Sequence, residues 1–213
     1  MISSNDLEQY LERFSTPEDP ILRKIYRETN IRMLNPRMNT GHIQGQLISM
    51  LSGMLNPALI LEIGTFTGYS AICLSKGLIP GGKLHTIELN DEVADIARGY
   101  FMLAGLEQNI VTHIGNALSI IPSLKLNFDL IYIDGEKREY PEYFKLSMAC
   151  LKPGGYLIAD NVLWDGKVLE SEDKYDPATK AINDFNELVG NCRLLEKIFL
   201  PLRDGLLIAQ LKP

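Results

Sequence analysis

The sequence predicts an α/β protein built around a doubly wound, mostly parallel sheet. Between residues 59 and 189, short apolar runs alternate with stretches of helical periodicity, as in a parallel sheet whose strands are connected by helices. The runs are apolar at nearly every position, as expected for strands that helices cover on both faces. We therefore expect seven strands, one of them antiparallel at the C-terminal end, and a helical extension before the first strand.

Five strand-type runs lie inside this alternating region and two follow it. They are residues 59–63, 84–87, 110–113, 130–133, 156–159, 193–200 and 206–211. The last two flank the turn Arg203-Asp204-Gly205 and form a hairpin, which supplies the antiparallel strand. Helices are predicted over residues 69–78, 91–105, 141–152 and 177–189. Asn90 is a good N-cap for the second of these helices, and Pro153-Gly154-Gly155 is expected to end the third.

Residues 1–55 contain no strand-type run. Helices are predicted there at about 5–14, 20–29 and 42–54. A chain of 213 residues is long enough for one large domain with an extension, since a domain typically has ~150 residues. We expect a single domain over residues 1–213, with a helical extension over 1–55 and an α/β core over 56–213.

Composition and charge exclude several classes of protein. Hydrophobic residues make up 46% and charged residues 23% of the chain, which excludes a disordered or collagen-like protein. No apolar run reaches the ~18 residues of a membrane span, and the charged start MISSNDLEQYLERF lacks the apolar core of a secretory signal. Three cysteines at wide spacings fit reduced thiols in a cytoplasmic protein. The net charge of −6 disfavours a nucleic-acid partner held mainly by a basic surface.

A glycine turn follows the first predicted strand in the segment LEIGTFTGYS, residues 61–70. Gly64 allows a sharp turn and close approach of a ligand to the backbone. The pattern G-x-x-x-G lacks the signatures of a dinucleotide site and of a P-loop. Glu88 ends the next strand, where an acidic side chain would accept hydrogen bonds from ribose hydroxyls. A nucleoside that carries a carboxylate, such as S-adenosylmethionine, fits this combination; the alternative is a plain glycine-lined turn with a solvated Glu88.

Acidic and amide side chains follow the fourth and fifth predicted strands. Asp134 ends one strand, and Asp160 and Asn161 end the next, 26 residues later. If these strands are neighbours, the three side chains share one edge of the sheet. Their oxygen atoms would favour Mg²⁺, with Mn²⁺ or Ca²⁺ as alternatives. Lys137 is placed to act as a general base beside such a cation; the alternative is that the acidic pairs are simple turns and that Lys137 is solvated.

Further motifs extend this pattern along the chain. They are MNTG at 38–41, Gly45-Gln46, Tyr140 with Tyr143, KPGG at 152–155, DNVLWDGKV at 160–168 and PLRDGL at 201–206. With these motifs, the chain over roughly residues 35–211 resembles the cation-dependent class I O-methyltransferases, the family of catechol and caffeoyl-CoA O-methyltransferases and their small bacterial relatives. The resemblance implies a Rossmann-like fold, a homodimer, and S-adenosylmethionine as cofactor.

The resemblance also implies roles for individual residues. The cofactor would contact Met38, Thr40, Glu62, Gly64, Ser70, Glu88, Asn116, Ala117 and Asp134. Within this set, Glu62 would lie near the methionyl amino group, Ser70 would hold the carboxylate and Glu88 the ribose, and Asn116-Ala117 would border the adenine. Asp134, Asp160 and Asn161 would bind Mg²⁺, and Lys137 would be the catalytic base.

The sequence departs from the family pattern in three places. Glu136 and Asn116 stand where the family commonly has Asp, and neither change removes a metal ligand. The carboxylate that animal catechol enzymes place against the substrate has no clear match around Lys197–Leu200, so the orientation of the substrate is open.

The sequence therefore predicts a cytoplasmic, S-adenosylmethionine- and metal-dependent O-methyltransferase acting on a catechol-like small molecule, such as a caffeoyl or flavonoid compound. The alternative is methylation of 5-hydroxyuridine in tRNA, as in some bacterial relatives. A basic stretch favours it, although this stretch could be a solvated helix face: Arg23, Lys24, Arg27, Arg32 and Arg37. A non-catalytic nucleotide-binding module is disfavoured by the retained metal ligands and Lys137. Residues 165–180 are expected to be either a mobile lid over the acceptor or a plain surface loop.

Overall fold

The computed structural model describes residues 4–213, with side chains from residue 6 onward, so residues 1–3 of the predicted extension lie outside the described residues. The helices are α1 (Ser4–Phe14), α2 (Pro20–Arg32), α3 (His42–Leu55), α4 (Tyr69–Ser75), α5 (Asp91–Leu103), α6 (Ala117–Leu124), α7 (Tyr140–Cys150) and α8 (Pro177–Asn191). The strands are β1 (Leu59–Ile63), β2 (Lys83–Glu88), β3 (Ile110–Ile114), β4 (Phe128–Ile133), β5 (Leu151–Asp160), β6 (Leu195–Leu200) and β7 (Leu206–Leu211). Short 3₁₀ helices are η1 (Pro36–Met38), η2 (Lys137–Glu139), η3 (Trp164–Leu169) and η4 (Glu172–Lys174).

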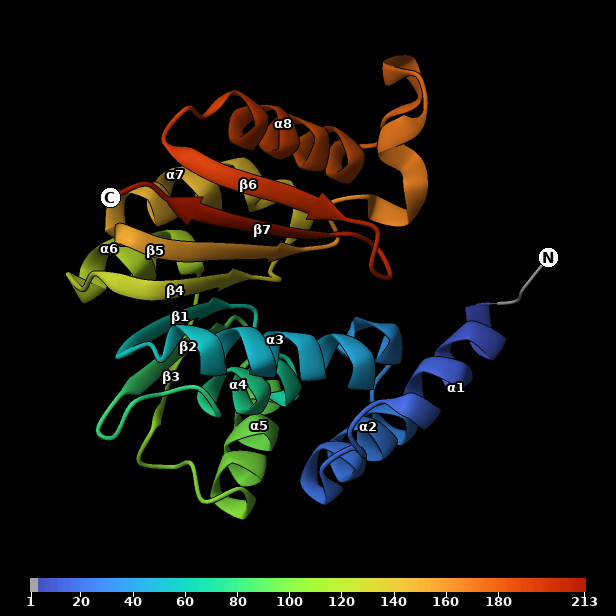
Figure 1. The fold of residues 1–213 in the computed structure, drawn as a ribbon, viewed down its shortest axis with the longest axis vertical. Helices are drawn as coiled ribbons and strands as arrows, with labels where there is room; N and C mark the ends of the chain where they lie inside the picture. Colours follow the sequence, from blue (N-terminus) through green and yellow to red (C-terminus); the bar gives the residue numbers. More distant parts are fainter. Residues whose placement is uncertain (1–3) are drawn as a thin grey trace.

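The seven strands form one sheet in the order β3-β2-β1-β4-β5-β7-β6 (Figure 1). Strands β1 to β5 pair in parallel, whereas β7 runs antiparallel to both β5 and β6. This confirms the predicted doubly wound, mostly parallel sheet with one antiparallel strand near its C-terminal end. The strand order reverses between β1 and β4, and ligands of such sheets bind beyond the carboxyl ends of the strands at this switch point.

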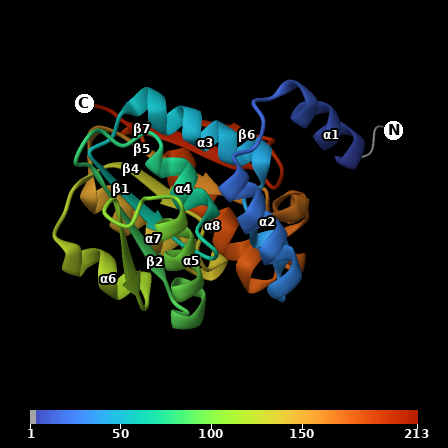
Figure 2. The same cartoon turned by 90° about the horizontal axis from the view of Figure 1, so that it is seen from below.

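Helices cover both faces of the sheet, as the apolar strands predicted (Figures 1 and 2). One apolar core joins α6, α7 and α8 to the sheet, and a second joins α2, α3, α4 and α5 to the other face. Alternate residues of β1 point to opposite cores: Leu61 and Ile63 belong to the first, and Ile60 belongs to the second. The fold is therefore held by two separate apolar layers that share one sheet.

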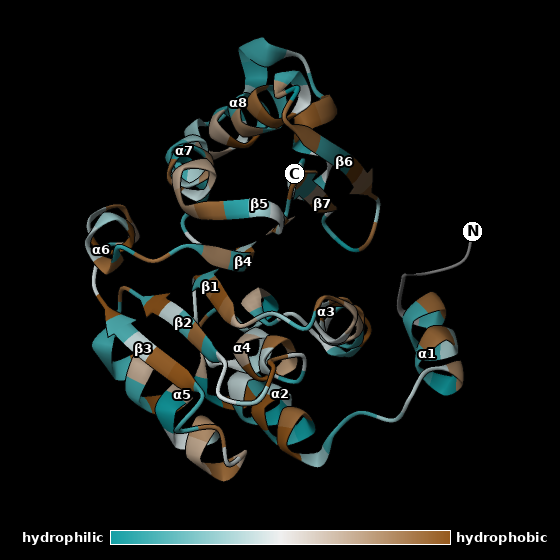
Figure 3. Ribbon diagram, turned by 60° about the vertical axis from the view of Figure 1, so that its left-hand side comes forward, coloured by the Kyte–Doolittle hydropathy of each residue, from teal (hydrophilic) through white to brown (hydrophobic). Residues whose placement is uncertain are grey.

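The N-terminal extension is helical, as predicted, but its parts differ in how they attach. Helices α2 and α3 contribute buried Leu22, Ile25 and Ile48 to the second core. Helix α1 lies at the periphery (Figure 3) and leaves Tyr10 and Phe14 at 61% and 68% exposed. Within residues 4–213, no helix is both long enough and apolar enough to span a membrane.

Two elements differ from the sequence prediction. The KPGG segment was expected to be a helix stop, but β5 begins at Leu151 directly after α7, and the pairing with β4 shifts register between Phe128 and Leu130. Gly154, with φ of 78°, permits this irregular start. Helix α6 was not predicted, because Pro122 interrupts its apolar stretch and proline disfavours helix interiors.

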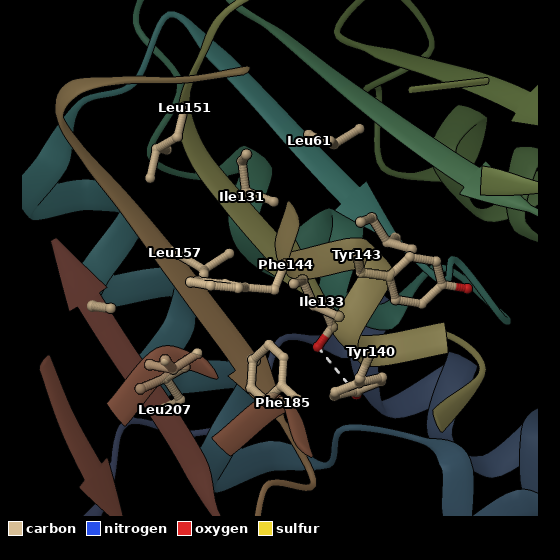
Figure 4. Packing of buried hydrophobic residues seen from close by; sticks show 14 of the residues in the cluster. Leu61, Ile131, Ile133, Tyr140, Tyr143, Phe144, Leu151, Leu157, Phe185 and Leu207 are labelled. Carbon is tan, nitrogen blue, oxygen red and sulfur yellow. Dashed lines mark hydrogen bonds between the residues drawn. The ribbon is translucent and has the colours of Figure 1, made fainter. Parts of the chain in front are cut away.

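An aromatic cluster of the first core lies directly below the carboxyl ends of β4 and β5 (Figure 4). The ring of Phe185 packs edge-on against Tyr140 and Phe144, with centroids 5.3 and 5.9 Å away. Tyr140 is fully buried, and its hydroxyl lies 3.0 Å from the carbonyl oxygen of Asp160. Core packing thus determines where this phenol meets the polar residues above it.

Candidate active site

The glycine turn after β1 is shaped by close contact between strands. Gly64 has φ of 98°, and a side chain on it would overlap the carbonyl oxygen of Asp134. Gly64 thus lies close to the backbone that follows β4, and its contact with a ligand stays a prediction. The amide of Phe66 donates to the carboxylate of Glu88 at 2.8 Å, so the turn is also tied to the end of β2.

Glu62 lies under this turn and is fully buried. Its Oε2 accepts a hydrogen bond of 2.6 Å from the Thr86 hydroxyl, whereas its Oε1 has no hydrogen-bond partner in the protein. Burial raises the pKa of Glu62 to about 8, although the hydroxyls of Ser70 and Thr86 oppose this rise. A buried, unpartnered carboxylate oxygen is an attachment point for a ligand that brings a positively charged donor.

Other predicted cofactor residues lie around the carboxyl ends of β1 to β3. Ser70 is buried in the first turn of α4. Glu88 accepts a second backbone hydrogen bond, from Asn90 at 3.0 Å. Asn116 caps α6 by accepting from the amide of Leu118 at 2.7 Å, and Ala117 begins that helix. Their contacts with a cofactor remain predictions.

The segment that contains Met38 and Thr40 is anchored from the far end of the chain. The guanidinium of Arg203 donates to the carbonyl oxygens of Asn39, at 3.0 Å, and of Thr40. Thr40 is buried, and Met38 is 56% exposed. In the sequence, Arg203 belongs to the predicted hairpin turn and to the PLRDGL motif, neither of which indicates this contact; the tertiary fold creates it.

Four polar residues meet at the ends of β4 and β5. The Lys137 ammonium donates to the Asp134 carboxylate at 2.7 Å and to the Tyr140 hydroxyl at 3.0 Å. The Tyr140 hydroxyl in turn donates to the main-chain oxygen of Asp160 at 3.0 Å. The structure therefore brings together Asp134, Lys137 and Asp160, as predicted from the equivalent placement of the two aspartates at strand ends.

The charges in this cluster are strongly coupled. Burial raises the pKa of Asp134 to about 6, with the attraction of Lys137 opposing the rise and the repulsion of Asp160 adding to it. Burial disfavours the charged form of Lys137, but the contacts with Asp134 and Tyr140 outweigh it and hold the pKa of Lys137 above its ordinary value. In this arrangement Lys137 is thus a protonated ion-pair partner.

Asp160 and Asn161 are held by residues for which the sequence predicts no role. Gln44 of α3 donates to Oδ2 of Asp160 at 2.6 Å, and the hydroxyl of Tyr132 lies 3.4 Å from the same oxygen. The side-chain amide of Asn161 donates to Asp204 at 3.2 Å. Gln44 stands next to the Gly45-Gln46 motif and Asp204 is within PLRDGL, so the motifs marked their positions without indicating these contacts.

The donor set at these strand ends suits a hard divalent cation. Ile133 pairs with Ala159, so Asp134 and Asp160, the next residues, end adjacent parallel strands at the same level. Their mutual repulsion is what a divalent cation between them would relieve. Among the described residues, no group of three or more His, Cys, Asp or Glu side chains could hold a metal ion. The third predicted ligand, Asn161, directly follows Asp160, and two carboxylates with one amide oxygen fit Mg²⁺.

Comparisons with known proteins agree with this geometry. The family model described as O-methyltransferase matches residues 12–212. A catechol O-methyltransferase from Niastella koreensis is 32% identical over 186 residues, covering 83% of this chain and 84% of the relative. A caffeoyl-CoA O-methyltransferase from Eucalyptus gunnii is 29% identical over 223 residues, covering 99% and 89%. The solved structure of the O-methyltransferase from Bacillus cereus in complex with SAH superposes with a TM-score of 0.90 at 30% identity and covers 97% of both chains.

Proposed function

The chain belongs to the O-methyltransferase family, and from this premise we propose that it transfers a methyl group from S-adenosylmethionine to a hydroxyl of a catechol-like small molecule, with the help of a divalent cation. The observation that carries this proposal is the convergence of Asp134, Lys137 and Asp160 at the carboxyl ends of β4 and β5, beside the glycine turn. The proposed cation site and the proposed donor site are then neighbours at the switch point of the sheet.

Glu62 supports S-adenosylmethionine as the methyl donor. The unpartnered Oε1 of Glu62 is buried, and the α-amino group of the donor would supply the missing positive hydrogen-bond donor. Glu88 sits where ribose hydroxyls would bind. The relative from Bacillus cereus was solved with SAH, which is the donor after methyl transfer. We therefore assign the donor to the carboxyl ends of β1 and β2, beside Glu62 and Glu88.

The proposed cation ligands are Asp134, Asp160 and Asn161, with Mg²⁺ as the first choice. When bound, such a cation stabilises negative charge on the acceptor oxygen. Lys137 is the proposed base. The attraction of Asp134 keeps Lys137 protonated in the arrangement described above, and it would weaken once Asp134 holds a cation, which disfavours the ammonium form. The ammonium proton would then pass to solvent, and the neutral amine would take the hydroxyl proton of the acceptor. The acceptor oxygen then bonds to the methyl carbon as the sulfonium bond breaks. Tyr140 holds Nζ of Lys137 in place at 3.0 Å.

The acceptor is proposed to be a small molecule rather than tRNA. The basic stretch on α2 is partly neutralised, since Glu28 lies 3.9 Å from Lys24 and 3.4 Å from Arg32, and Glu18 lies 3.8 Å from Arg23. Paired charges offer less attraction to phosphates than free ones. The relatives described above are named for catechol and caffeoyl-CoA acceptors, which agrees with this choice.

A homodimer is proposed as the working form. Leu7, Tyr10, Leu11 and Phe14 repeat at helical spacing on α1, and each is at least 39% exposed. An amphipathic helix with an uncovered apolar side is typical of an interface. Light scattering after size-exclusion chromatography would measure the mass, and a monomer at micromolar concentration would contradict this part of the proposal.

The function is tested by turnover with S-adenosylmethionine and a panel of catechol, caffeoyl and flavonoid acceptors. We expect activity that EDTA removes and Mg²⁺ restores. Asp160→Asn should abolish it while preserving the fold, because the Gln44 amide can turn so that its Oε1, which has no partner now, accepts from the new amide nitrogen. Glu107→Gln, an exposed change in the loop before β3, is the matched control. Full activity of Asp160→Asn in metal-free buffer would refute the cation-dependent mechanism.

A further inference from the structure

The turn of residues 203–205 and the loop of residues 161–165 are joined by four hydrogen bonds. Two are between backbones: Val162 donates to Gly205 at 3.2 Å, and Leu163 donates to the carbonyl oxygen of Asp204 at 2.9 Å. The other two end on the Asp204 carboxylate, one from the Asn161 side chain and one from the Asp165 amide. The loop that follows β5 is thus bound to the hairpin turn along its whole length.

The conformation of this loop needs such support. Asn161, Trp164 and Asp165 have φ values of 58°, 46° and 56°. These lie in the left-handed region, which residues other than glycine occupy only when surrounding contacts hold them there. Asp204 contributes two of those contacts, because each of its carboxylate oxygens accepts from a different residue of the loop.

The contact between Asp204 and Asn161 also determines which atom of the Asn161 side-chain amide is free to bind a cation. An asparagine amide carries an oxygen that can bind a cation and a nitrogen that cannot. A carboxylate can only accept hydrogen bonds, so the nitrogen of Asn161 must face Asp204, which it does at 3.2 Å. The oxygen is then the amide atom left for the cluster of Asp134 and Asp160.

We propose that Asp204 is a positioning residue that orients the Asn161 amide so that its oxygen, not its nitrogen, serves the divalent cation. This inference rests on the proposed function, because it concerns the same cation site. Asp204 itself does not need to contact the cation, the donor or the acceptor. Substituting a residue that hydrogen-bonds to a metal ligand commonly lowers metal affinity by about 10–100-fold.

The test uses direct binding of Mn²⁺, followed by electron paramagnetic resonance in the absence of donor and acceptor. Asp204→Ala should weaken Mn²⁺ binding by about 10–100-fold and leave the affinity for S-adenosylhomocysteine unchanged. Asp165→Asn is the matched control: it removes one negative charge from the same loop, from an exposed side chain, and keeps the backbone donor. An equal loss in both variants would mean that only charge matters, and it would overturn the positioning role.

A second pair of variants, both carrying Asn161→Asp, tests whether Asp204 orients the side chain at position 161 or only supports the loop. In Asn161→Asp the two side-chain oxygens are equivalent, so no partner is needed to choose between them. Adding Asp204→Ala to this background should leave Mn²⁺ affinity unchanged or raise it, because a repulsive neighbour is removed. An equal loss in both backgrounds would overturn the proposal. If Asp204→Ala lowers the melting temperature, Mn²⁺ binding is measured in both backgrounds at a temperature where each variant is folded, with the same expected difference.

The outcomes distinguish the two proposals. If the wild-type protein fails to bind Mn²⁺, the cation site itself is refuted, and the role of Asp204 with it. If the wild type binds Mn²⁺ and Asp204→Ala binds it equally well, only the role of Asp204 is refuted, and the proposed function stands.

Discussion

Replacing Glu62 by glutamine tests how the site recognises the methyl donor. Glu62 is fully buried and its pKa is raised to about 8, chiefly by that burial. At pH 7 the free protein therefore holds this carboxyl about 90% protonated. A bound α-amino group needs the ionised form, so binding of the donor should release about one proton from the wild type. The amide that Glu62→Gln introduces has no proton to release.

The size of the effect depends on pH. A hydrogen bond to a charged group contributes about 1.5–3 kcal/mol, so Glu62→Gln should weaken donor binding by roughly 10–150-fold above pH 8. At pH 7, ionising the carboxyl first costs the wild type about 1.4 kcal/mol. The difference between wild type and variant should then shrink to about tenfold or less.

The assay is calorimetric titration with S-adenosylhomocysteine at pH 7 in two buffers that differ in ionisation enthalpy. Glu62→Gln is the control for protons that the ligand itself exchanges, because the free ligand has the same amino group in both titrations. If the wild type releases no more protons than Glu62→Gln, then Glu62 is not the partner of that amino group. An affinity difference independent of pH would refute the buried, protonated state of Glu62 in the free protein.

Four further substitutions have defined outcomes. Lys137→Ala should lower kcat by about 10²–10⁴-fold without changing donor affinity. Steady-state kinetics checks this, and a normal kcat would refute the role of Lys137 as the base. His85 and His113 stack with ring nitrogens 3.0 Å apart, and burial lowers the pKa of both below 6.5. The folded protein therefore binds fewer protons than the unfolded chain, so stability should decline as pH falls below about 6.5. His113→Gln should flatten this decline in thermal unfolding, and an unchanged slope would refute the assignment. Gly64→Ala should lower the free energy of unfolding by more than about 3 kcal/mol in urea. The alanine would have a positive φ, and its methyl group would overlap the carbonyl oxygen of Asp134. Gly53→Ala, on α3 with nothing within 4 Å of the new methyl group, should instead stabilise by about 0.5–1 kcal/mol.

The layers of the fold could be predicted because they depend on local patterns. Apolar runs such as residues 59–63 and 130–133 are strands buried on both faces, and their alternation with helices determines a parallel sheet. The meeting of Asp134 and Asp160 followed from the same rule, since parallel strands end at one edge. The two wrong predictions also had local causes. Pro122 disfavoured a helix where α6 forms, and the glycines of KPGG indicated a helix stop although they lie within β5.

What holds the candidate site could be decided only by the tertiary structure. Gln44 and Asp160 are 116 residues apart, Asn39 and Arg203 are 164 apart, and Asn161 and Asp204 are 43 apart. A single side chain carries no periodic signal, so nothing in the sequence indicates which distant partner it will meet. Those pairings depend on the final positions of β5, of the 203–205 turn and of α3. The chain's pattern thus determined which chemical groups reach the edge of the sheet, and three-dimensional packing determined how each of them is oriented there.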